Sequence, residues 1–467
     1  MSDHSEVLIL GGGPAGYVAA LQAARKGFSV TLVEREAVGG TCLNRGCIPT
    51  KALLSATEPL DRRAAMAAMG LKAEGLSVDL PALRAFSADC ASKLVKGVEF
   101  LLEKRKVRVV RGEGRFDAPG LLAVAASDGT TSRLSADRIL IATGSRSRPL
   151  ALAPEDGEAV VGSDALVTVP KVPARLVIIG AGVVGLELGT LYRRLGSKVV
   201  FLEMLPGLLP FCDGDVAAHA GAALRRQGLS FHFKATLREV RTEGPALRVL
   251  FADGNGQERA LEADTVLVAV GREPVSAGLG LEKVGVETDG KGFVKVGAGW
   301  KTTAPGVWAA GDVCGGLLLA HKASHEALAV VGHWAGEPEP MEKPHIPNVV
   351  YTHPELALVG LTESAAKEAG YTQLKVGKFS FRGNGRAITA LDDEGLVKVV
   401  ADGASEAVLG AQILGPAASE LIHTVAVAIA SGVRLLDLRH AVFAHPTLSE
   451  AVHEALLAAA GEPLHQL

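Results

Sequence analysis

Two cysteines five residues apart are the residues of this chain whose type and spacing most directly suggest chemistry. Cys42 and Cys47 lie in the segment GGTCLNRGCIPTK, residues 39–51. A metal site would need two more ligands, and the sequence has neither a second CxxC nor a matching histidine pair. The remaining choice is between a redox-active dithiol and two inert thiols. We expect the redox role, because Thr41 can cap a helix whose first turn carries Cys42, and a helix N-terminus favours thiolate.

A supersecondary pattern occurs twice, and each copy could bind a dinucleotide. It consists of an apolar strand, a glycine-rich turn, a helix and a second strand that is followed by glutamate. We expect these parts at residues 7–10, 11–16, 17–26 and 29–33 in the first copy, and at 176–179, 180–185, 186–195 and 198–202 in the second. The glycines and glutamates are Gly11, Gly13, Gly16 and Glu34, then Gly180, Gly182, Gly185 and Glu203. The repeat predicts two separate nucleotide-binding domains.

Each residue of this pattern has a physical task in dinucleotide binding. The first glycine permits the turn, the second lets the backbone approach a pyrophosphate, and the third lets helix and strand pack closely. The helix N-terminus supplies unpaired N–H groups for the phosphates, and the glutamate can accept hydrogen bonds from the ribose hydroxyls. The stretch MLPGLLP after Glu203 contains no arginine or lysine that could bind a 2′-phosphate. We therefore expect NAD rather than NADP at the second site.

A histidine and a glutamate near the C-terminus form a second candidate constellation. His445 and Glu450 stand in HPTLSE. Taken alone, His-Pro usually marks a turn and the glutamate is usually solvated. Dithiol oxidation, however, needs a base near neutral pH, and histidine suits that task when a carboxylate fixes its tautomer. His353 in YTHPE has no acid at matching spacing, so we assign it to structure.

The composition is that of a soluble globular protein with several domains. The chain has 467 residues, 48% hydrophobic and 21% charged, with a net charge of -3. This excludes a basic footprint for nucleic acid or an anionic membrane. The apolar runs are short and the start MSDHSEVLIL lacks a basic segment, so we expect no membrane span, no secretory signal and a cytoplasmic location. The odd count of five cysteines argues against a disulfide framework.

The elements that position these residues predict an α/β protein with two Rossmann-like dinucleotide-binding domains and a C-terminal α+β domain. Similar strand-to-glycine segments, RILIATGSR at 138–146 and TVLVAVGRE at 265–273, close the two units. Residues 149–157 and GEPEPMEKP at 336–344 are typical of linkers. The expected domains are 1–148 together with 272–345 for the first dinucleotide, 149–271 for the second, and 346–467 for the C-terminal α+β domain. In the last we expect strands at 348–351, 374–381, 395–401 and 407–414, and helices at 419–431 and 449–460.

The motifs together resemble the FAD-dependent pyridine nucleotide–disulfide oxidoreductases over essentially the whole chain. They are GGGPAG, the cysteine segment, GAGVVGLELG, GVWAAGDV at 306–313, LLAHKA at 318–323, YTHPE at 351–355 and HPTLSE at 445–450. The resemblance implies FAD and NAD as cofactors, with residues 1–148 and 272–345 binding FAD and residues 149–271 binding NAD. It also implies that residues 346–467 are an α+β dimerisation domain. It implies oxidation of a protein-bound dihydrolipoyl group, carried by a lipoylated acyltransferase or a glycine-cleavage carrier protein. Two departures are Leu358, where a large aromatic is common, and SHEAL after LLAHKA in place of an acidic run.

The resemblance also implies a role for each matching residue. Cys42 would meet the substrate, Cys47 would be the charge-transfer thiolate facing the flavin, and Lys51 would lie near the reactive flavin nitrogen, paired with Glu187. His445 and Glu450 would come from the opposite subunit, so the enzyme would be a homodimer. The other FAD contacts implied are Thr41, Gly114, Thr143, Gly144, Ser145, Asp312, Leu318, Leu319, Ala320 and His321. Leu237 and Gly271 would contact NAD through their backbones.

The alternatives are other members of the same family and a non-catalytic docking protein. A mercuric reductase or a large thioredoxin reductase is expected to end in a second redox pair, whereas this sequence ends in GEPLHQL. A glutathione reductase is expected to carry arginines after the second acid, and a soluble transhydrogenase lacks the cysteine pair. A docking protein is expected to have lost Cys42, Cys47 or His445. The sequence does not indicate which 2-oxo-acid dehydrogenase or glycine-cleavage complex the protein would serve.

Overall fold

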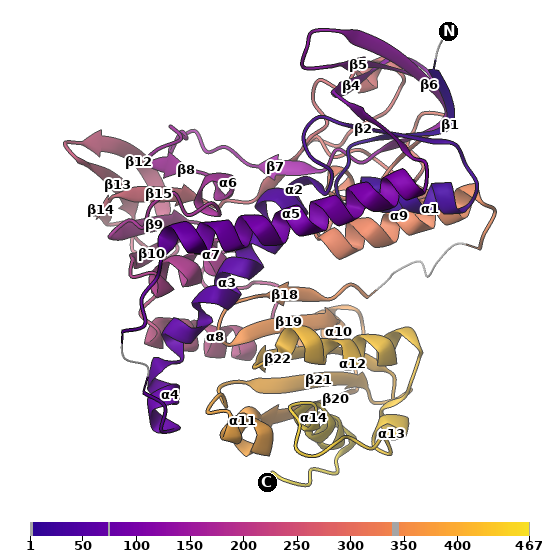
Figure 1. Cartoon of the computed structure of the whole chain (residues 1–467). Helices are drawn as coiled ribbons and strands as arrows, with labels where there is room; N and C mark the ends of the chain where they lie inside the picture. Colours follow the sequence, from indigo (N-terminus) through magenta and orange to yellow (C-terminus); the bar gives the residue numbers. More distant parts are fainter. Residues whose placement is uncertain (1–2, 73–74, 339–344, 467) are drawn as a thin grey trace.

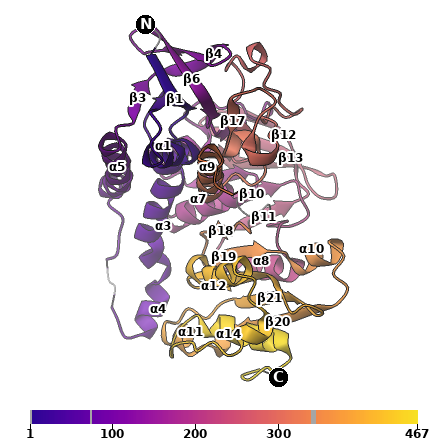
Figure 2. The same ribbon diagram turned by 90° about the vertical axis from the view of Figure 1, so that its right-hand side faces the viewer.

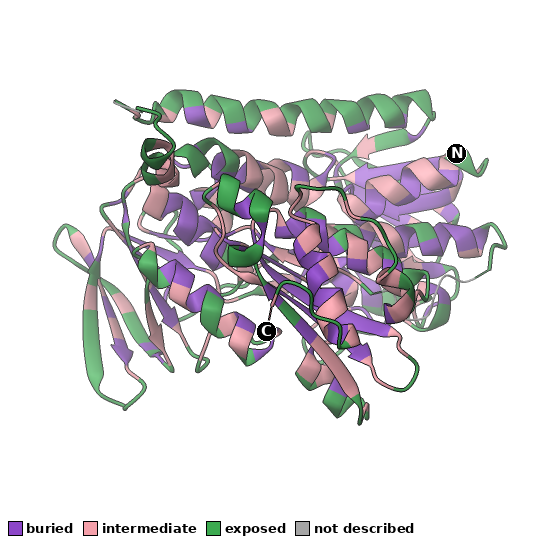
Figure 3. Cartoon of the chain, turned by 90° about the horizontal axis from the view of Figure 1, so that it is seen from below, coloured by how far each residue is buried: buried purple, intermediate pink, exposed green. Residues whose placement is uncertain are grey.

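The computed structural model describes residues 3–72, 75–338 and 345–466. Three main sheets with helices packed on them make up the molecule, and the C-terminal sheet lies apart from the first in both ribbon views (Figure 1; Figure 2). Buried residues concentrate in the strands and on the inner helix faces, whereas the longest helix, α5 (Leu80–Lys104), exposes most of its residues (Figure 3). Most of the linker expected at 336–344 lies outside the described residues.

The first sheet is built around the first glycine-rich unit. Its strands run in the order β3 (Arg108–Arg111), β2 (Val30–Glu34), β1 (Asp3–Leu10), β6 (Thr131–Ile141), β5 (Leu121–Ala125) and β4 (Glu113–Ala118), and β17 (Val307–Ala309) pairs with β6. The strands β3, β2, β1, β6 and β17 are parallel. The helices α1 (Pro14–Arg25) and α9 (Ala320–Trp334) pack against each other beside this sheet. Because β17 and α9 come late in the chain, the sequence returns to this sheet after forming the second unit.

The second unit has its own parallel sheet. The strand order is β11 (Ser230–Phe233), β10 (Lys198–Glu203), β9 (Arg175–Ile179), β15 (Thr265–Val268) and β8 (Val160–Val161). Helix α7 (Val183–Arg194) follows β9, as α1 follows β1. An antiparallel sheet of β12 (Thr236–Glu243), β13 (Ala246–Ala252) and β14 (Glu258–Ala263) packs beside it. The chain passes between the two units twice. The two connecting segments pair with each other as the antiparallel strands β7 (Ser145–Ser147) and β16 (Arg272–Pro274).

The C-terminal sheet is antiparallel throughout. Its order is β18 (Asn348–Val350), β19 (Glu355–Gly360), β22 (Val408–Gly415), β21 (Leu396–Asp402) and β20 (Leu374–Ser380). Helices α12 (Ala418–Ala430) and α14 (Glu450–Ala460) bury their apolar side chains against it. The α+β architecture expected for this part is confirmed. Strand β19, which contributes to the core, is absent from the strands that we expected.

Candidate functional site

The first glycine-rich turn has the backbone that a dinucleotide requires. Gly11 has φ +105°, and a Cβ there would overlap the Ala142 carbonyl oxygen. A Cβ at Gly16 would overlap Gly11 O, so this glycine sets the close approach of α1 to β1. Gly13 is the N-cap of α1 and has no side-chain cap, and the nearest atom to a Cβ there is 3.9 Å away. The helix N-terminus is therefore open for phosphate oxygens.

The second turn repeats this geometry. Gly180 has φ +96°, and a Cβ at Gly185 would meet Gly180 O at 2.5 Å. Gly182, the N-cap of α7, has open space around it. Proline at the first turn of α1 starts that helix three residues before the predicted position, and α7 likewise begins at Val183 directly after its N-cap glycine.

The two glutamates occupy equivalent positions at the ends of β2 and β10. Glu34 accepts hydrogen bonds from the N–H groups of Gly12 (2.6 Å) and Glu36 (2.7 Å). Glu203 accepts them from Ala181 (2.8 Å) and Leu205 (2.8 Å). Each carboxylate is thus fixed at the rim of its turn. Since a carboxylate can accept about four hydrogen bonds, each glutamate can still accept hydrogen bonds from ribose hydroxyls. Both turns therefore fit a dinucleotide.

Glu203 should set the preference for the nicotinamide cofactor. Its fixed carboxylate would repel a 2′-phosphate, so Glu203→Ala should narrow the ratio of kcat/KM for NAD+ over NADP+ by about tenfold or more, equivalent to about 1.4 kcal/mol. Steady-state kinetics with both cofactors measure this ratio. An unchanged ratio would show that another residue sets the preference. Glu34→Ala is the matched control, because it changes the equivalent carboxylate of the other turn.

The cysteine pair lies directly against the first turn. Gly39 N–H donates to Gly12 O (2.8 Å), and a Cβ at Gly40 would approach Gly13 Cα to 2.7 Å. Helix α2 (Gly40–Arg45) carries Cys42, and helix α3 (Cys47–Asp61) begins with Cys47. The glycines of both segments thus allow their backbones to touch, so the cysteines are held beside the first dinucleotide site.

The expected helix cap at Thr41 is wrong. The N-cap of α2 is Gly39 in a left-handed conformation, φ +94°, and its helix has no side-chain cap. Thr41 lies inside the helix. Cys42 is the third residue of α2 and lies in its first turn, as expected, while Gly46 separates α2 from α3, whose first residue is Cys47. The N-terminus of the longer helix, α3, therefore favours the thiolate of Cys47.

The electrostatics of the pair distinguish the two sulfurs. A hydrogen bond from the Cys42 thiol and the charge of Lys51 lower the pKa of Cys47 to about 7, against burial and the Glu187 charge, which act to raise it. The same hydrogen bond, together with burial, raises the pKa of Cys42. In the reduced pair, these shifts favour the thiolate at Cys47 and the thiol at Cys42.

This assignment predicts a pH titration. Cys47 should lose its proton as the pH rises through about 7. Cys42→Ala removes the hydrogen-bond donor, so the midpoint should rise, whereas Cys42→Ser keeps a hydroxyl donor and should hold the midpoint near 7. The ultraviolet absorbance of the thiolate reports each midpoint in the reduced protein. Equal midpoints in the alanine and serine variants would contradict the hydrogen bond as the main cause.

A partly buried ion pair joins the cysteine helix to the second glycine-rich unit. Lys51 Nζ on α3 lies 2.7 Å from Glu187 Oε2 on α7, and Glu187 is buried. The other oxygen of Glu187 accepts from Tyr351 N–H (3.1 Å), and Lys51 Nζ lies 4.5 Å from the Tyr351 ring centroid. Our sequence analysis missed Tyr351 as a contact, although it begins the quoted YTHPE motif. The ion pair therefore connects helix α3, helix α7 and the segment at Tyr351.

Another polar network connects the segments at 143–145 and 312. Ser145 Oγ donates to Asp312 Oδ2 (2.6 Å), and Arg272 donates to both Ser145 Oγ and Ser145 O (2.7 Å each). Thr143 Oγ1 donates to Val275 O (2.6 Å), and Gly144 has φ +73°. Arg272 is a second residue that the sequence analysis missed. Its position directly after the turn glycine Gly271, φ +106°, was the available signal.

The remaining predicted cofactor contacts lie in three places. Gly114 on β4 is buried, and a Cβ there would meet Leu10 Cδ1 at 2.6 Å and Val33 Cγ1 at 3.2 Å, at the ends of β1 and β2. Leu318 and Leu319 directly precede helix α9, which starts at Ala320 and has Leu319 as its N-cap. On the first turn of this helix, His321 Nε2 lies 2.7 Å from Pro347 O. Leu237 is buried at the start of β12 in the same core as Leu202. Gly114 and Leu237 therefore both lie beside their expected turns.

His445 and Glu450 form the pair that their spacing predicted. His445 Nδ1 lies 3.0 Å from Glu450 Oε1, and Glu450 Oε2 accepts from Thr447 N–H (2.8 Å). The Thr447 N–H and the His445 ring both lower the pKa of Glu450, so the carboxylate stays charged and can fix the histidine. The His445 side chain is 78% exposed, with its Nε2 left available. Helix α14, which begins at Glu450, lies in the C-terminal part, far from α1 in both ribbon views (Figure 1; Figure 2).

His353 has no acid at matching spacing, as predicted, but it does have an acid partner elsewhere in the chain. His353 Nε2 lies 3.5 Å from Asp392 Oδ1, and Arg62 Nη1 lies 3.3 Å from Asp392 Oδ2. The partner is remote in sequence, so local spacing could not reveal it. Since His353 O also accepts from the Gln227 amide, the segment is anchored on several sides. This supports the structural assignment of His353 for a different reason from the one we gave.

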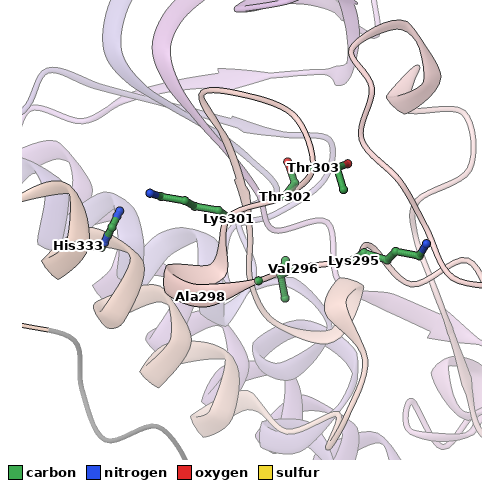
Figure 4. Close-up of a pocket in the computed structure, with 8 residues that line it drawn as sticks. Lys295, Val296, Ala298, Lys301, Thr302, Thr303 and His333 are labelled. Carbon is green, nitrogen blue, oxygen red and sulfur yellow. The ribbon is translucent and has the colours of Figure 1, made fainter.

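The described residues include a cavity of about 540 Å³ outside both turns (Figure 4). Its lining consists of Lys295, Val296, Gly297, Ala298, Lys301, Thr302, Thr303 and His333. None of these belongs to the predicted site. Among the described residues, no helix is long and apolar enough to cross a membrane.

Comparison with known proteins places the chain in a family. Residues 5–327 match the family model described as pyridine nucleotide-disulphide oxidoreductase, and residues 346–456 match the dimerisation domain of the same family. The chain belongs to the pyridine nucleotide-disulphide oxidoreductase family. The resemblance found in the sequence motifs is thereby confirmed, and so is the expected fold class.

The similar proteins include several of one kind. The mitochondrial dihydrolipoyl dehydrogenase of Pisum sativum is 39% identical, over 99% of this chain and 93% of that protein. Dihydrolipoyl dehydrogenase 3 of Pseudomonas putida is 41% identical, over 97% of each. Among solved structures, LpdA from Mycobacterium tuberculosis superposes with a TM-score of 0.90 at 29% identity, covering 97% of this chain and 99% of that one. The similarity thus extends over the full length of each.

Proposed function

We propose that this chain is a dihydrolipoamide dehydrogenase, which oxidises a protein-bound dihydrolipoyl group to lipoyl and reduces NAD+ to NADH. The observation that carries the proposal is that the segment containing Cys42 and Cys47 contacts both dinucleotide-binding units. The cysteine segment touches the first turn through Gly39 and Gly12, and Lys51 contacts the helix of the second turn through Glu187. The full-length similarity to dihydrolipoyl dehydrogenases supports the same reaction. FAD and NAD are the cofactors.

The proposal also assigns a cofactor or an interface to each segment of the chain. Residues 1–148 and 272–345 would bind FAD, residues 149–271 would bind NAD, and residues 346–467 would form the dimer. The first site would use the turn at 11–16 and the residues predicted at 143–145, 312 and 318–321. Lys51, Glu187, Thr41 and Gly114 would complete it, while Leu237 and Gly271 would contact NAD. The match of residues 346–456 to a dimerisation domain supports a homodimer.

The dithiol half-reaction follows from the asymmetry of the two cysteines. A substrate thiolate attacks Cys42 Sγ of the oxidised pair, the Cys42–Cys47 bond breaks, and Cys47 leaves as a thiolate. His445 takes the proton of the second substrate thiol, which then attacks the first substrate sulfur. This step breaks the mixed disulfide, forms the lipoyl disulfide and releases Cys42, which regains a proton. The cysteine pair has then gained two electrons, and Lys51 stabilises the Cys47 thiolate.

The turn at 11–16 and Glu34 would hold FAD, which would supply the two-electron chemistry between the cysteine pair and NAD+. The residues of the second turn hold the nicotinamide cofactor, and Glu203 would select it. Glu450 keeps the His445 ring in the tautomer whose Nε2 can take a proton. The partner would be a lipoylated acyltransferase or a glycine-cleavage carrier protein, and the cytoplasmic location expected from the sequence belongs to the same proposal.

A steady-state assay tests the proposed reaction. Dihydrolipoamide with NAD+ should give NADH. The kcat/KM for dihydrolipoamide should be far higher than that for reduced glutathione, and the kcat/KM for NAD+ should be far higher than that for NADP+. Because the dithiol is oxidised before the nicotinamide is reduced, double-reciprocal plots should be parallel. Preference for glutathione, or intersecting lines, would contradict the proposal.

A further inference from the structure

Two charged side chains are buried on helix α9, and the mechanism above uses neither. Lys322 and Glu326 are each 8% exposed. Lys322 Nζ lies 2.8 Å from Glu326 Oε1, at i,i+4 spacing. Charged side chains are rarely buried unless they are paired. The pairing explains how their charges are tolerated, but each side chain also makes a hydrogen bond away from its partner.

Those further hydrogen bonds hold both ends of one short turn. Gly311 N–H donates to Glu326 Oε2 (2.8 Å), and Lys322 Nζ donates to Gly315 O (3.0 Å). Between these two glycines lies the short 3-10 helix η3 (Asp312–Cys314). Both glycines have positive φ, +84° and +79°. The ion pair therefore fixes the entry and the exit of the turn that carries Asp312.

The same turn lies between two helices and beside the first dinucleotide unit. A Cβ on Gly311 would meet the Cβ atoms of Ala15 on α1 and Ala323 on α9, both at 3.2 Å. Asp312 itself accepts the hydrogen bond from Ser145 Oγ at 2.6 Å. The turn thus has little freedom to move toward either helix, and its ends are tied to buried charges. The carboxylate of Asp312 is thus held by Ser145, on a turn whose first glycine lies against Ala15 at the start of α1.

We propose that Lys322 and Glu326 are positioning residues for FAD binding, which act by fixing Asp312 through the backbone of Gly311 and Gly315. The inference rests on the proposed function, in which Asp312 belongs to the FAD site. Lys322 serves as a hydrogen-bond donor to a carbonyl and Glu326 as an acceptor from an N–H group. The two residues cannot be exchanged, because the Gly311 end of the turn needs a hydrogen-bond acceptor and the Gly315 end needs a donor.

Exchange of the two charges tests this directly. The single variants Lys322→Met and Glu326→Met should each weaken FAD binding to the apoprotein by about tenfold or more. The double variant Lys322→Glu/Glu326→Lys restores opposite charges at i,i+4 spacing, so it should recover much of the Tm of the apoprotein. It presents an acceptor to a carbonyl and a donor to an N–H group, so it should not recover FAD affinity. Flavin fluorescence gives the Kd, and thermal unfolding of the apoprotein gives Tm.

Two further variants keep the test decisive if the double variant does not fold. Glu326→Asp keeps the charge but is one methylene too short to reach Gly311 N–H, and should weaken FAD binding. Lys322→Arg keeps a charged donor and should retain most of the affinity. The exposed pair Asp89 and Lys93 on α5, 2.6 Å apart, is the matched control, and its charge exchange should change neither Kd nor Tm.

The outcomes separate this inference from the proposed function. Native FAD affinity in the single variants and in Glu326→Asp, or recovery of affinity in the charge-exchanged variant, would overturn the positioning role. Both results would leave the pair as a stabiliser of α9. Failure of the unmodified apoprotein to bind FAD would instead count against the proposed function.

Discussion

His445→Gln should slow the oxidation of dihydrolipoamide by about two to four orders of magnitude, the usual size of a general-base contribution. The side chain is exposed, its Nδ1 is held by Glu450, and its Nε2 is available for a substrate proton. Rapid mixing of the variant with dithiol in the absence of NAD+ measures this step. Transfer from NADH to an artificial electron acceptor involves no substrate thiol, so that activity should survive.

The chain supplies a matched control for this variant. His465 Nδ1 lies 2.7 Å from Glu454 Oε1, and Glu454 is one helical turn from Glu450 on α14. His465→Gln therefore removes a second exposed histidine from a similar ion pair in the same helix. It should leave the dithiol step unchanged. An equal loss in both variants would indicate damage to α14 rather than loss of a base.

Complementation between subunits tests where His445 acts. Inactive His445→Gln subunits are mixed with inactive Cys42→Ser subunits, and the heterodimer is isolated. If the base acts across a two-fold interface, one site carries both defects and the other carries neither, so about half of the sites should work. A heterodimer without activity would show that His445 serves its own subunit's cysteines or is not the base.

Cys42→Ser and Cys47→Ser should both lose dithiol oxidation by at least about four orders of magnitude, because a covalent nucleophilic step cannot proceed without either sulfur. Their spectra should differ. Cys42→Ser keeps the low-pKa thiolate of Cys47, so it should show a long-wavelength charge-transfer band when FAD is present. Cys47→Ser should lack the band. The band in Cys47→Ser alone would reverse the roles of the two cysteines.

Local sequence patterns predicted the parts of this structure that depend on local backbone geometry. The glycines at 11, 16, 180 and 185 could be recognised because a Cβ at each would collide with nearby backbone. The acids that follow them could be recognised because parallel strands end at the same edge of a sheet. The pair His445–Glu450 lies within six residues, so its spacing also carried the geometry.

Contacts between remote segments were not predictable in the same way. Thr41 was assigned a cap because its residue type suits one, but the left-handed Gly39 occupies that position. Asp392 meets His353 only after β19 and the following elements fold together. Lys322 and Glu326 look like an ordinary i,i+4 pair on a solvated helix face. Their burial depends on β17 and α9 returning to the first sheet, which no local pattern reports.

The most direct test of the central claim is an anaerobic titration of the FAD-loaded protein with dihydrolipoamide, before any NAD+ is added. The account predicts that one dithiol per active site is oxidised to lipoamide and that two electrons are stored per subunit. Alkylation should then label Cys42 and Cys47 only after this reduction. Subsequent NAD+ should release one NADH per site. If no dithiol is consumed until NAD+ is present, or if Cys42 and Cys47 remain unchanged while NADH forms, electrons do not pass through the cysteine pair and the account is wrong.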